Sequence, residues 1–528
     1  MRILVAEPIA AEGIERLRAE HEVDEAIGKS PDELAALLPD YEALVVRSQV
    51  KVDARLIEAG RRLVVVGRAG VGVDNVDLDA ATRAGIVVVN APTGNTIAAA
   101  EHTLGLLYAL ARRIPAADAS VRRGEWRRSA FTGVELRGRT IGIVGMGKIG
   151  QAIAARARAM EMRVVAADPY FSAEQAALHG TELVELTELL ETADVVTVHV
   201  PLTRSTRGLI GAAEIARMKP TAFVLNVARG GIVDEAAVAR ALADGRLGGA
   251  AFDVYDPEPP PADSPLRAAP NTVLTPHLGA STEEAQVAVA EEVADQILDV
   301  LAGRSARYAV NAPLLSPETA RVLEPYVPLA ELLGRFHSQF ARGGATRYTL
   351  EIAGDPAAHD AAPLVAAALR GLLESTTTER VNLVNAPSVA KARGITLAEH
   401  RTPDAGPYAA LLTLTGTAGG RTTTVAGTVI NGEPRIVRLD DYWIDMAPAE
   451  IMLITRHHDR PGTMGRIGQI LGEADVNISA MHLARSAPRA DALMVLALDD
   501  DVPVDVVAGI RDHAAVLDVW PIRLAGDH

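Results

Sequence analysis

Residues 140–150 read TIGIVGMGKIG, and this stretch decides the fold of the first half of the chain. Ile141, Ile143 and Val144 predict a short buried strand that runs directly into a glycine-rich turn, and a helix-forming segment follows over residues 151–160. Such a turn lets the backbone approach a pyrophosphate, and the N–H groups that open the helix face the negative charge. The stretch therefore predicts a dinucleotide site built on Gly145, Gly147 and Gly150.

An acidic residue strengthens this prediction. The next expected strand, residues 163–167, ends at Asp168, 18 residues after Gly150. A carboxylate at this position can bind the two hydroxyls of the adenosine ribose and repel a 2′-phosphate, which favours NAD over NADP. Glycine-rich turns also serve ordinary helix–strand packing, but the preceding strand, the following helix and the spacing of the acid favour the cofactor.

Length and composition exclude several classes of protein. A chain of 528 residues exceeds the size of one hydrophobic core and indicates three or four domains. A net charge of −16 argues against a nucleic-acid partner, and the absence of cysteine excludes disulfides, thiolate metal sites and cysteine nucleophiles. We predict no metal site. The opening MRILVAEPIA resembles a first strand rather than a signal peptide, and no long apolar run predicts a membrane span, so we expect a cytoplasmic protein.

The first 280 residues alternate compact Val/Ile-rich runs with amphipathic runs. This rhythm predicts parallel sheets covered by helices on both faces, that is, two doubly wound Rossmann-like α/β domains with a cleft between them. A largely apolar helix over residues 96–114 would connect the two. The expected strands are residues 3–6, 43–47, 63–67 and 86–90 in the first unit and residues 140–144, 163–167, 195–199, 223–226, 250–254 and 273–275 in the second.

The second half of the chain has a different pattern of polar and apolar residues. Between residues 318 and 447, polar and apolar residues alternate over 347–352, 409–415, 422–430 and 435–439, and Asn431-Gly432 is a strong hairpin signal. These features predict an α+β domain with antiparallel strands. The last part predicts strands at 450–455, 476–484, 492–497 and 516–521 and helices at 462–472 and 504–513, a ferredoxin-like βαββαβ unit.

Three ionisable residues follow the ends of expected strands in the second unit: Arg229, Glu258 and His277. Because ligands of open α/β sheets bind beyond the carboxyl ends of the strands, we expect these side chains to meet. The chemistry would be hydride transfer at a carbon that bears a hydroxyl. His277 would exchange the hydroxyl proton, Glu258 would hold the imidazole, and Arg229 would grip a carboxylate or carbonyl.

Each of these residues also has an ordinary structural interpretation. A Pro-His pair in a loop can be a capped surface histidine, a glutamate among prolines is usually solvated, and an arginine before Gly-Gly can cap a strand end. Asp253, at the end of its strand, could reach the nicotinamide amide or could satisfy the next backbone turn.

Several motifs together resemble one family. GMGKIG with Asp168, NVARGG, DPEPP, PHLGAST, RAGVGVDNVD at 68–77 and GNTIAAAEH at 94–102 are similar to the D-isomer-specific 2-hydroxyacid dehydrogenases, over roughly residues 1–305. The resemblance implies catalytic roles for Arg229, Glu258 and His277. It also implies cofactor contacts at Lys148, Ile149, Asp168, Val227, Ala228, Arg229, Asp253, His277, Leu278, Gly279 and Ala280. Related formate dehydrogenases carry an amide at the position of Glu258.

The resemblance extends over the whole chain. A middle domain and the C-terminal HDRPGTMGRIGQILGEADVNISAM are similar to long-form members of the family, which end in an ACT domain. This implies a substrate domain made of residues 1–95 and 283–308, a nucleotide domain at 96–282, an intervening domain at 309–448 and an ACT domain at 449–528. It further implies NAD-dependent oxidation of 3-phospho-D-glycerate, the first step of L-serine biosynthesis, in a homotetramer that serine inhibits.

The resemblance also places ligand contacts. It implies substrate contacts at Arg47, Ser48 and Asn95, and a segment at Trp126-Arg127-Arg128 that reaches the neighbouring active site of a dimer. A local cation–π patch is the alternative for that segment. Serine contacts are implied at His457, Asp459 and Asn477; Asp and Asn suit an amino acid, but they also cap helices and form turns. The pair His457-His458 departs from the usual pattern of serine-sensing domains.

Two rival functions stay open. The first is another D-2-hydroxyacid dehydrogenase or a hydroxypyruvate reductase, against which the extra sensor domains argue. The second is an NAD-responsive corepressor-like binding protein, which would share the Arg/Glu/His set. The C-terminal ACT-like unit argues against this second interpretation.

Overall fold

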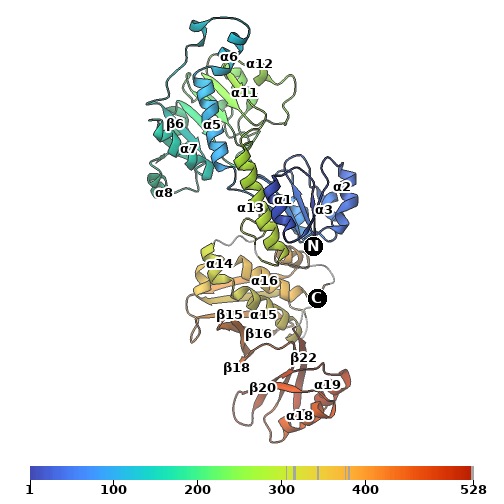
Figure 1. Ribbon diagram of the computed structural model, residues 1–528. Helices are drawn as coiled ribbons and strands as arrows, with labels where there is room; N and C mark the ends of the chain where they lie inside the picture. The colour runs from blue at the N-terminus through green and yellow to red at the C-terminus, as the bar shows by residue number, and fades with distance from the viewer. Residues whose placement is uncertain (305, 313–316, 342–343, 375, 378–380, 525–528) are drawn as a thin grey trace.

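The computed structural model describes residues 1–304, 306–312, 317–341, 344–374, 376–377 and 381–524. Within these residues the strands form four sheets, arranged as four lobes along the molecule (Figure 1). The two N-terminal lobes are doubly wound parallel sheets, the middle lobe has a mixed sheet, and the C-terminal lobe has an antiparallel sheet. The predicted fold class is confirmed.

The first lobe has the strand order β2-β1-β3-β4-β5, with all pairs parallel. Apolar residues point to both faces, so α1 and α13 cover one face and α2, α3 and α4 cover the other. Strand β2 was not predicted, because EVDE is a polar edge strand with little to bury. The elements are β1 (Arg2–Val5), α1 (Ala11–Arg18), β2 (Glu22–Glu25), α2 (Pro31–Leu37), β3 (Ala43–Val46), α3 (Ala54–Ala59), β4 (Val65–Arg68), α4 (Leu78–Arg83), β5 (Val87–Asn90) and α13 (Glu283–Leu301).

The second lobe has the order β12-β11-β10-β9-β6-β7-β8, again all parallel. The strand order reverses between β6 and β9, and the glycine turn follows β6 at this switch point. The strands are β6 (Thr140–Val144), β7 (Arg163–Ala167), β8 (Glu182–Leu183), β9 (Val195–Val198), β10 (Phe223–Asn226), β11 (Gly249–Phe252) and β12 (Thr272–Leu274).

Helices cover both faces of this second sheet. On one face lie α5 (Thr96–Ala111) and α7 (Lys148–Ala159), and on the other lie α9 (Leu186–Thr192), α10 (Ala212–Ile215), α11 (Glu235–Ala243) and α12 (Pro265–Ala268). The remaining helices are α6 (Ile114–Arg122) and α8 (Ala173–Leu178). The prediction of one helix over residues 96–114 was wrong at its C-terminal end. Helix α5 ends at Ala111, and α6 begins at Ile114 after Arg113, which has a left-handed conformation with φ of 53°.

The chain returns from the second lobe to the first through α13, which packs along α1 and β4 (Figure 1). The following segment adds to the edge of β5, where Ala309 bridges Val89 in antiparallel sense. Asn311 then bonds Val88 N–H and Ile86 C=O. From the middle lobe, the Asn382 amide donates to the Gly85 carbonyl at 2.5 Å. The middle lobe is therefore docked on the turn that precedes β5.

The middle lobe has the order β14-β13-β15-β16-β17-β18. The predicted antiparallel strands are confirmed, since β13, β15, β16 and β17 pair in this sense. The sheet also contains a strand that was not predicted, β14, which follows β13 through two helices and pairs with it in parallel. The Asn431-Gly432 hairpin is confirmed, with Ile430 paired to Glu433 and positive φ at both turn residues. The elements are α14 (Pro317–Leu323), α15 (Tyr326–Phe340), β13 (Arg347–Gly354), α16 (Ala362–Glu374), α17 (Ala386–Ala392), β14 (Thr396–Thr402), β15 (Ala410–Ala418), β16 (Arg421–Ile430), β17 (Glu433–Leu439) and β18 (Tyr442–Met446).

The C-terminal lobe has the predicted βαββαβ order and the strand arrangement β20-β21-β19-β22. Both helices cover one face of the sheet. The other face packs against the middle lobe, and residues of β19, β21 and β22 share one continuous apolar core with it. The elements are β19 (Ile451–His458), α18 (Thr463–Glu473), β20 (Ile478–Arg485), β21 (Asp491–Leu498), α19 (Val504–Arg511) and β22 (Val516–Arg523).

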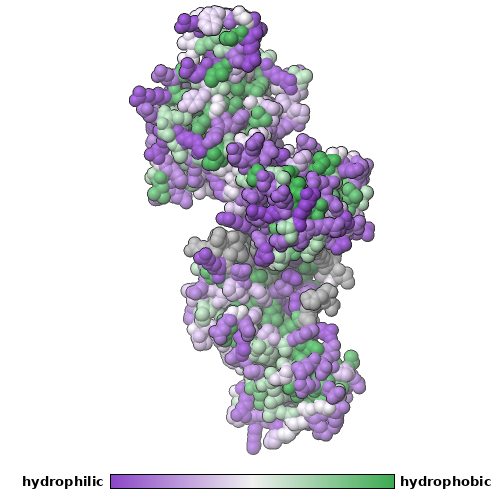
Figure 2. All heavy atoms as spheres, viewed as in Figure 1, coloured by the Kyte–Doolittle hydropathy of each residue, from purple (hydrophilic) through white to green (hydrophobic). Residues whose placement is uncertain are grey.

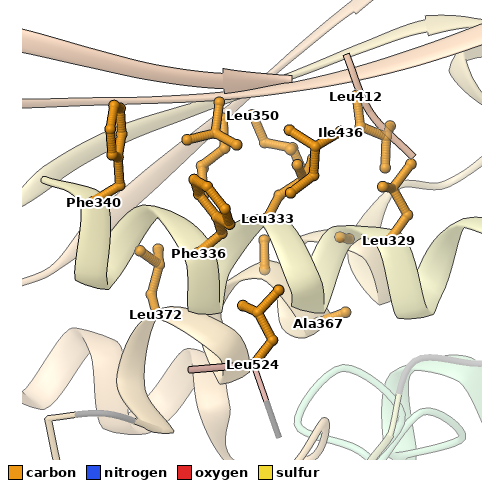
Figure 3. Packing of buried hydrophobic residues seen from close by; sticks show 14 of the residues in the cluster. Leu329, Leu333, Phe336, Phe340, Leu350, Ala367, Leu372, Leu412, Ile436 and Leu524 are labelled. Atoms are coloured by element: carbon orange, nitrogen blue, oxygen red, sulfur yellow. The ribbon is translucent and has the colours of Figure 1, made fainter. Parts of the chain in front are cut away.

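Helix α15 lies at the centre of this shared core. Phe336 and Phe340 point from it toward the middle sheet, and Leu524, which follows β22, lies on the opposite side (Figure 3). The ring centres of Phe340 and Trp520, the latter on β22, are 4.8 Å apart. Arg335 on α15 donates to the Leu524 carbonyl. The middle and C-terminal lobes are thus joined by core packing as well as by the chain.

The outer surface is mixed in polarity, with hydrophilic residues over most of the visible face of the two N-terminal lobes (Figure 2). Among the described helices, none combines the length and the apolar character needed to cross a bilayer.

We predict that Gly371→Ala destabilises the middle lobe. A Cβ at Gly371 on α16 would lie 2.0 Å from the Glu331 carbonyl of α15, so the two helices would have to separate. Overpacking of this kind costs about 2 kcal/mol, which corresponds to roughly 4 to 8 °C in the melting temperature. Thermal unfolding followed by circular dichroism measures it.

The control is Gly468→Ala on α18, where a Cβ has no neighbour within 4 Å. Alanine favours a helix interior over glycine, so this variant should melt no lower than the parent. Equal losses in the two variants would contradict the close helix crossing.

Candidate active site

A cavity of about 1020 Å³ lies between the first and second lobes. Residues 71–74 and Asn95 line one side of it. Ile149, residues 227–229, Asp253 and His277 line the other, and each of them follows a strand of the second sheet. The carboxyl ends of β6, β10, β11 and β12 therefore meet at this cavity, as the sequence predicted.

The glycine turn fits a dinucleotide. Gly145 has φ of 100°, and a Cβ at Gly150 would lie 2.1 Å from the Gly145 carbonyl, so the turn closes only without side chains there. Gly147 precedes α7, no side chain of the described residues caps the helix start, and the space beside Gly147 is open. The first N–H groups of α7 are thus available to a pyrophosphate.

Asp168 lies where the ribose contact was predicted, directly after β7. Its carboxylate accepts from Met146 N–H and Tyr170 N–H, both at 2.8 Å, so it also fixes the glycine turn. Next to the turn, the Lys148 ammonium lies 5.2 Å from the ring centre of Tyr308, on the segment that leaves α13.

Glu258 and His277 form a hydrogen-bonded pair at the cavity. Glu258 Oε2 lies 2.9 Å from His277 Nδ1, and Oε1 accepts from Tyr255 N–H at 3.0 Å. Burial acts to raise the pKa of Glu258, but the bonds from His277 and Tyr255 outweigh it and hold this pKa below its ordinary value. Because an ionised carboxylate only accepts, His277 Nδ1 carries a proton, and Nε2 is the nitrogen available for proton exchange.

A second histidine at the cavity, His199, has a different environment. Burial lowers the pKa of His199 to about 3, and its ring bonds Thr197 Oγ1 at 2.8 Å. It therefore stays neutral at physiological pH.

Arg229 spans the two sides of the cavity. Its Nε donates to Asp74 Oδ2 at 3.0 Å, across the cleft, and its Nη1 donates to the Ala228 carbonyl at 2.7 Å. Asn226, at the end of β10, fixes this turn by bonds to Ala228 N–H and the Arg229 carbonyl. The geometry presents a guanidinium at the cavity wall, where it can bind a planar anion.

Arg68 is a cation that the sequence analysis did not select. It ends β4, where burial, and secondarily the like charge of Arg229, lowers the pKa of Arg68 to about 10. Its buried Nε has no hydrogen-bond partner among the described residues. Arg68 could have been found by the rule that selected Arg229, since it also stands at the carboxyl end of a buried parallel strand.

The predicted substrate residues occupy two places. Asn95 lines the cavity, and its buried Oδ1 has no partner in the described part of the chain. Arg47 and Ser48 follow β3 and lie beyond the cavity wall, although the charge of Arg47 acts on Arg68. Glu7 fixes their loop, because its carboxylate accepts from the N–H groups of Arg47, Gln49 and Val50.

The predicted cofactor residues beyond the glycine turn also gather here. Asp253 is fully buried, and its carboxylate accepts from Leu278 N–H at 2.7 Å and Gly279 N–H at 2.8 Å. Val227, Ala228, Gly279 and Ala280 line the cavity beside it.

The predicted effector residues do not meet within one chain. His457 is buried in β19, and Asp459 bonds Arg485 at the end of β20. Asn477 stands before the start of β20 and bonds Asp499. Asp459 and Asn477 are therefore at opposite ends of the edge strand β20.

Three family models match the chain. Residues 104–279 match the NAD binding domain of D-isomer specific 2-hydroxyacid dehydrogenases, residues 322–440 match the D-3-phosphoglycerate dehydrogenase intervening domain, and residues 451–512 match the ACT domain. The NAD cofactor and the C-terminal ACT domain expected from the sequence are thereby confirmed.

Relatives cover nearly the whole chain. D-3-phosphoglycerate dehydrogenase of Synechocystis sp. is 46% identical over 526 residues, which are 99% of this chain and 95% of the relative. The enzyme of that name from Archaeoglobus fulgidus is 42% identical, over 99% of this chain and 100% of the relative.

Solved structures match more than half of the chain. The TT0316 protein of Thermus thermophilus is 39% identical with a TM-score of 0.55, over 59% of this chain and 100% of that one. A NAD-dependent formate dehydrogenase from Staphylococcus aureus in complex with NAD is 31% identical, with a TM-score of 0.51. The match covers 57% of this chain and 96% of that one. The resemblance read from the sequence is confirmed: the chain belongs to the D-3-phosphoglycerate dehydrogenase family of D-isomer-specific 2-hydroxyacid dehydrogenases.

Proposed function

We propose that this chain oxidises 3-phospho-D-glycerate to 3-phosphohydroxypyruvate with NAD, the first step of L-serine biosynthesis. The observation that carries the proposal is the Glu258–His277 pair, 2.9 Å apart, in which His277 lines the cavity together with Arg229. Such a pair can exchange the proton of a substrate hydroxyl. The names of the full-length relatives support the choice of substrate.

His277 Nε2 removes the hydroxyl proton during oxidation and returns it during reduction. Glu258 accepts from Nδ1–H and stabilises the imidazolium that forms. Arg229 binds the substrate carboxylate and orients the carbon that loses its hydrogen. Bound NAD would supply the hydride acceptor.

The phosphate end of the substrate requires cations. We assign it to Arg47, Ser48 and Asn95, as the family resemblance implies, and add Arg68. The buried Nε of Arg68, a donor without a partner among the described residues, supports this, because a buried polar group without a partner is costly unless a ligand satisfies it. Like-charged guanidiniums near one another also favour a dianionic ligand.

The cofactor assignment follows the same edge of the sheet. Asp168 would bind the ribose hydroxyls, and Asp253 would bind the nicotinamide amide. The remaining contacts are proposed at Gly145, Gly147, Lys148, Ile149, Gly150, Val227, Ala228, Leu278, Gly279 and Ala280.

We propose a division of the chain into residues 1–95 with 283–308, 96–282, 309–448 and 449–528, and a homotetramer in the cytoplasm. The starts of α5 at Thr96 and α13 at Glu283 support the first two boundaries. Trp126, which is 81% exposed, supports a contact of its segment with a second copy. The intervening domain would sense anions or substrate.

Serine would bind between two C-terminal lobes. Strand β20 is an edge strand with exposed Met481 and Leu483. If two copies paired β20 in antiparallel sense, Asn477 of one copy would approach His457 and Asp459 of the other. The opposite placement of these residues in one chain supports an effector site between subunits.

NADH consumption with 3-phosphohydroxypyruvate tests the function. We expect turnover that prefers this substrate to unphosphorylated hydroxypyruvate by about tenfold or more, since a lost charged hydrogen bond costs about 1.5–3 kcal/mol. Serine at millimolar concentration should slow it. Equal rates on both substrates would favour the reductase, and tight NADH binding without turnover would favour the corepressor-like protein.

Substitution of an arginine proposed to bind the substrate phosphate should weaken substrate binding without weakening cofactor binding. We expect Arg47→Ala to raise the KM for 3-phosphohydroxypyruvate by about 10- to 100-fold, for the same loss of a charged bond, while the KM for NADH stays within about twofold. The control is Arg55→Ala in the same lobe, whose guanidinium bonds Asp32 at the surface. Equal increases for substrate and cofactor would remove Arg47 from its role.

Glu258→Gln should shift the pH dependence of reduction to lower pH. Reduction requires the imidazolium, and the Glu258 carboxylate, whose own pKa is held low by the bond from His277, stabilises that charge. Without the carboxylate, we expect the falling limb of the pH profile of kcat/KM for 3-phosphohydroxypyruvate to move to lower pH.

The control for this shift is Glu235→Gln. Glu235 contacts the same loop through Asp256 N–H but does not bond His277. If the falling limb of the pH profile of kcat/KM does not move in Glu258→Gln, or moves equally in both variants, the pairing of Glu258 with His277 is contradicted.

A further inference from the structure

Asp253 organises the loop that carries His277. Its Oδ1 accepts from Leu278 N–H at 2.7 Å and Thr275 Oγ1 at 2.6 Å, and its Oδ2 accepts from Gly279 N–H at 2.8 Å. Its own carbonyl accepts from His277 N–H at 2.8 Å. The loop from residue 275 to 279 is therefore wrapped around one buried residue.

The backbone of His277 depends on this arrangement. His277 has φ of 57°, a left-handed conformation that residues with a side chain rarely adopt. Such a conformation persists only where the surroundings enforce it. Here the two N–H groups that follow His277 are held by the Asp253 carboxylate.

One further donor reaches the same carboxylate from another element. His102 on α5 places its Nε2 at 3.1 Å from Asp253 Oδ1 and 3.2 Å from Thr275 Oγ1. Thr275 already gives its hydroxyl hydrogen to Oδ1, and an ionised carboxylate only accepts. The hydrogen in both contacts of His102 must therefore come from Nε2.

We propose that His102 is a positioning residue, which fixes the loop of the acid–base histidine through Asp253 and Thr275. The proposal rests on the function proposed above for His277. His102 itself is outside the set of groups that would touch substrate or cofactor. It lies on α5, the helix that begins at the cavity directly after Asn95 and packs against β11 and β12 of the second lobe. The same helix thus contributes to both the substrate wall and the acid–base loop.

Two substitutions separate hydrogen bonding from packing. His102→Leu removes the donor. His102→Gln keeps an N–H donor that can reach the place of Nε2. The control is Glu101→Gln on the adjacent residue, whose carboxylate bonds Arg156 at the surface.

The first measurement is amide hydrogen exchange of the peptide that contains Leu278 and Gly279. In His102→Leu we expect exchange about tenfold faster than in the parent, since one lost hydrogen bond weakens the closed loop. His102→Gln and Glu101→Gln should match the parent. This measurement needs no turnover, so it decides on the positioning role even if the proposed reaction fails.

The second measurement is steady-state reduction of 3-phosphohydroxypyruvate. We expect kcat to fall about tenfold or more in His102→Leu, with KM within about twofold, and to recover in His102→Gln. Equal losses in the Leu and Gln variants would overturn the proposal, because packing alone would then explain them. Unchanged exchange and unchanged kcat in His102→Leu would overturn it as well. A parent protein without turnover would count against the proposed function alone.

Discussion

A buried carboxylate at the end of β11 shapes the catalytic edge of this protein. Asp253 has no exposed surface, so its ionised form must find donors within the fold. Burial acts to raise the pKa of Asp253, yet the bonds from His102, Thr275 and Leu278 hold it below its ordinary value. The loop after β12 satisfies the charge with its own N–H groups, and this is why His277 stands where Glu258 can reach it.

The topology explains how much of the site was readable from sequence. Parallel strands end at one edge, so Arg229, Asp253, Glu258 and His277 could be grouped once the strands were recognised. His102 could not, because it lies inside a helix, and only the packing of α5 against β11 and β12 brings it to Thr275. Its spacing from Asp253 in the sequence carries no signal.

The strands that the sequence patterns missed, β2, β8, β14 and β18, all lie at the edges of their sheets. The side chains of β2 and β14 are mostly exposed, so neither strand shows the apolar run or the alternation that marks a buried strand. Strand β8 has only two residues, fewer than such a pattern needs. The parallel pairing of β14 with β13 requires a long crossover, which α16 and α17 supply. The hairpin at Asn431-Gly432 was readable, because that turn chemistry is local.

The apolar core shared by the middle and C-terminal lobes limits how the chain can be divided. Cutting the chain after residue 448 would break the contact between Trp520 and Phe340. It would also expose Met452 and Ile454, which are buried in the shared core. Each fragment would then present a large apolar face to water and tend to associate. The C-terminal lobe is therefore no detachable module; an excised or transplanted version would have to carry α15 and the middle sheet with it.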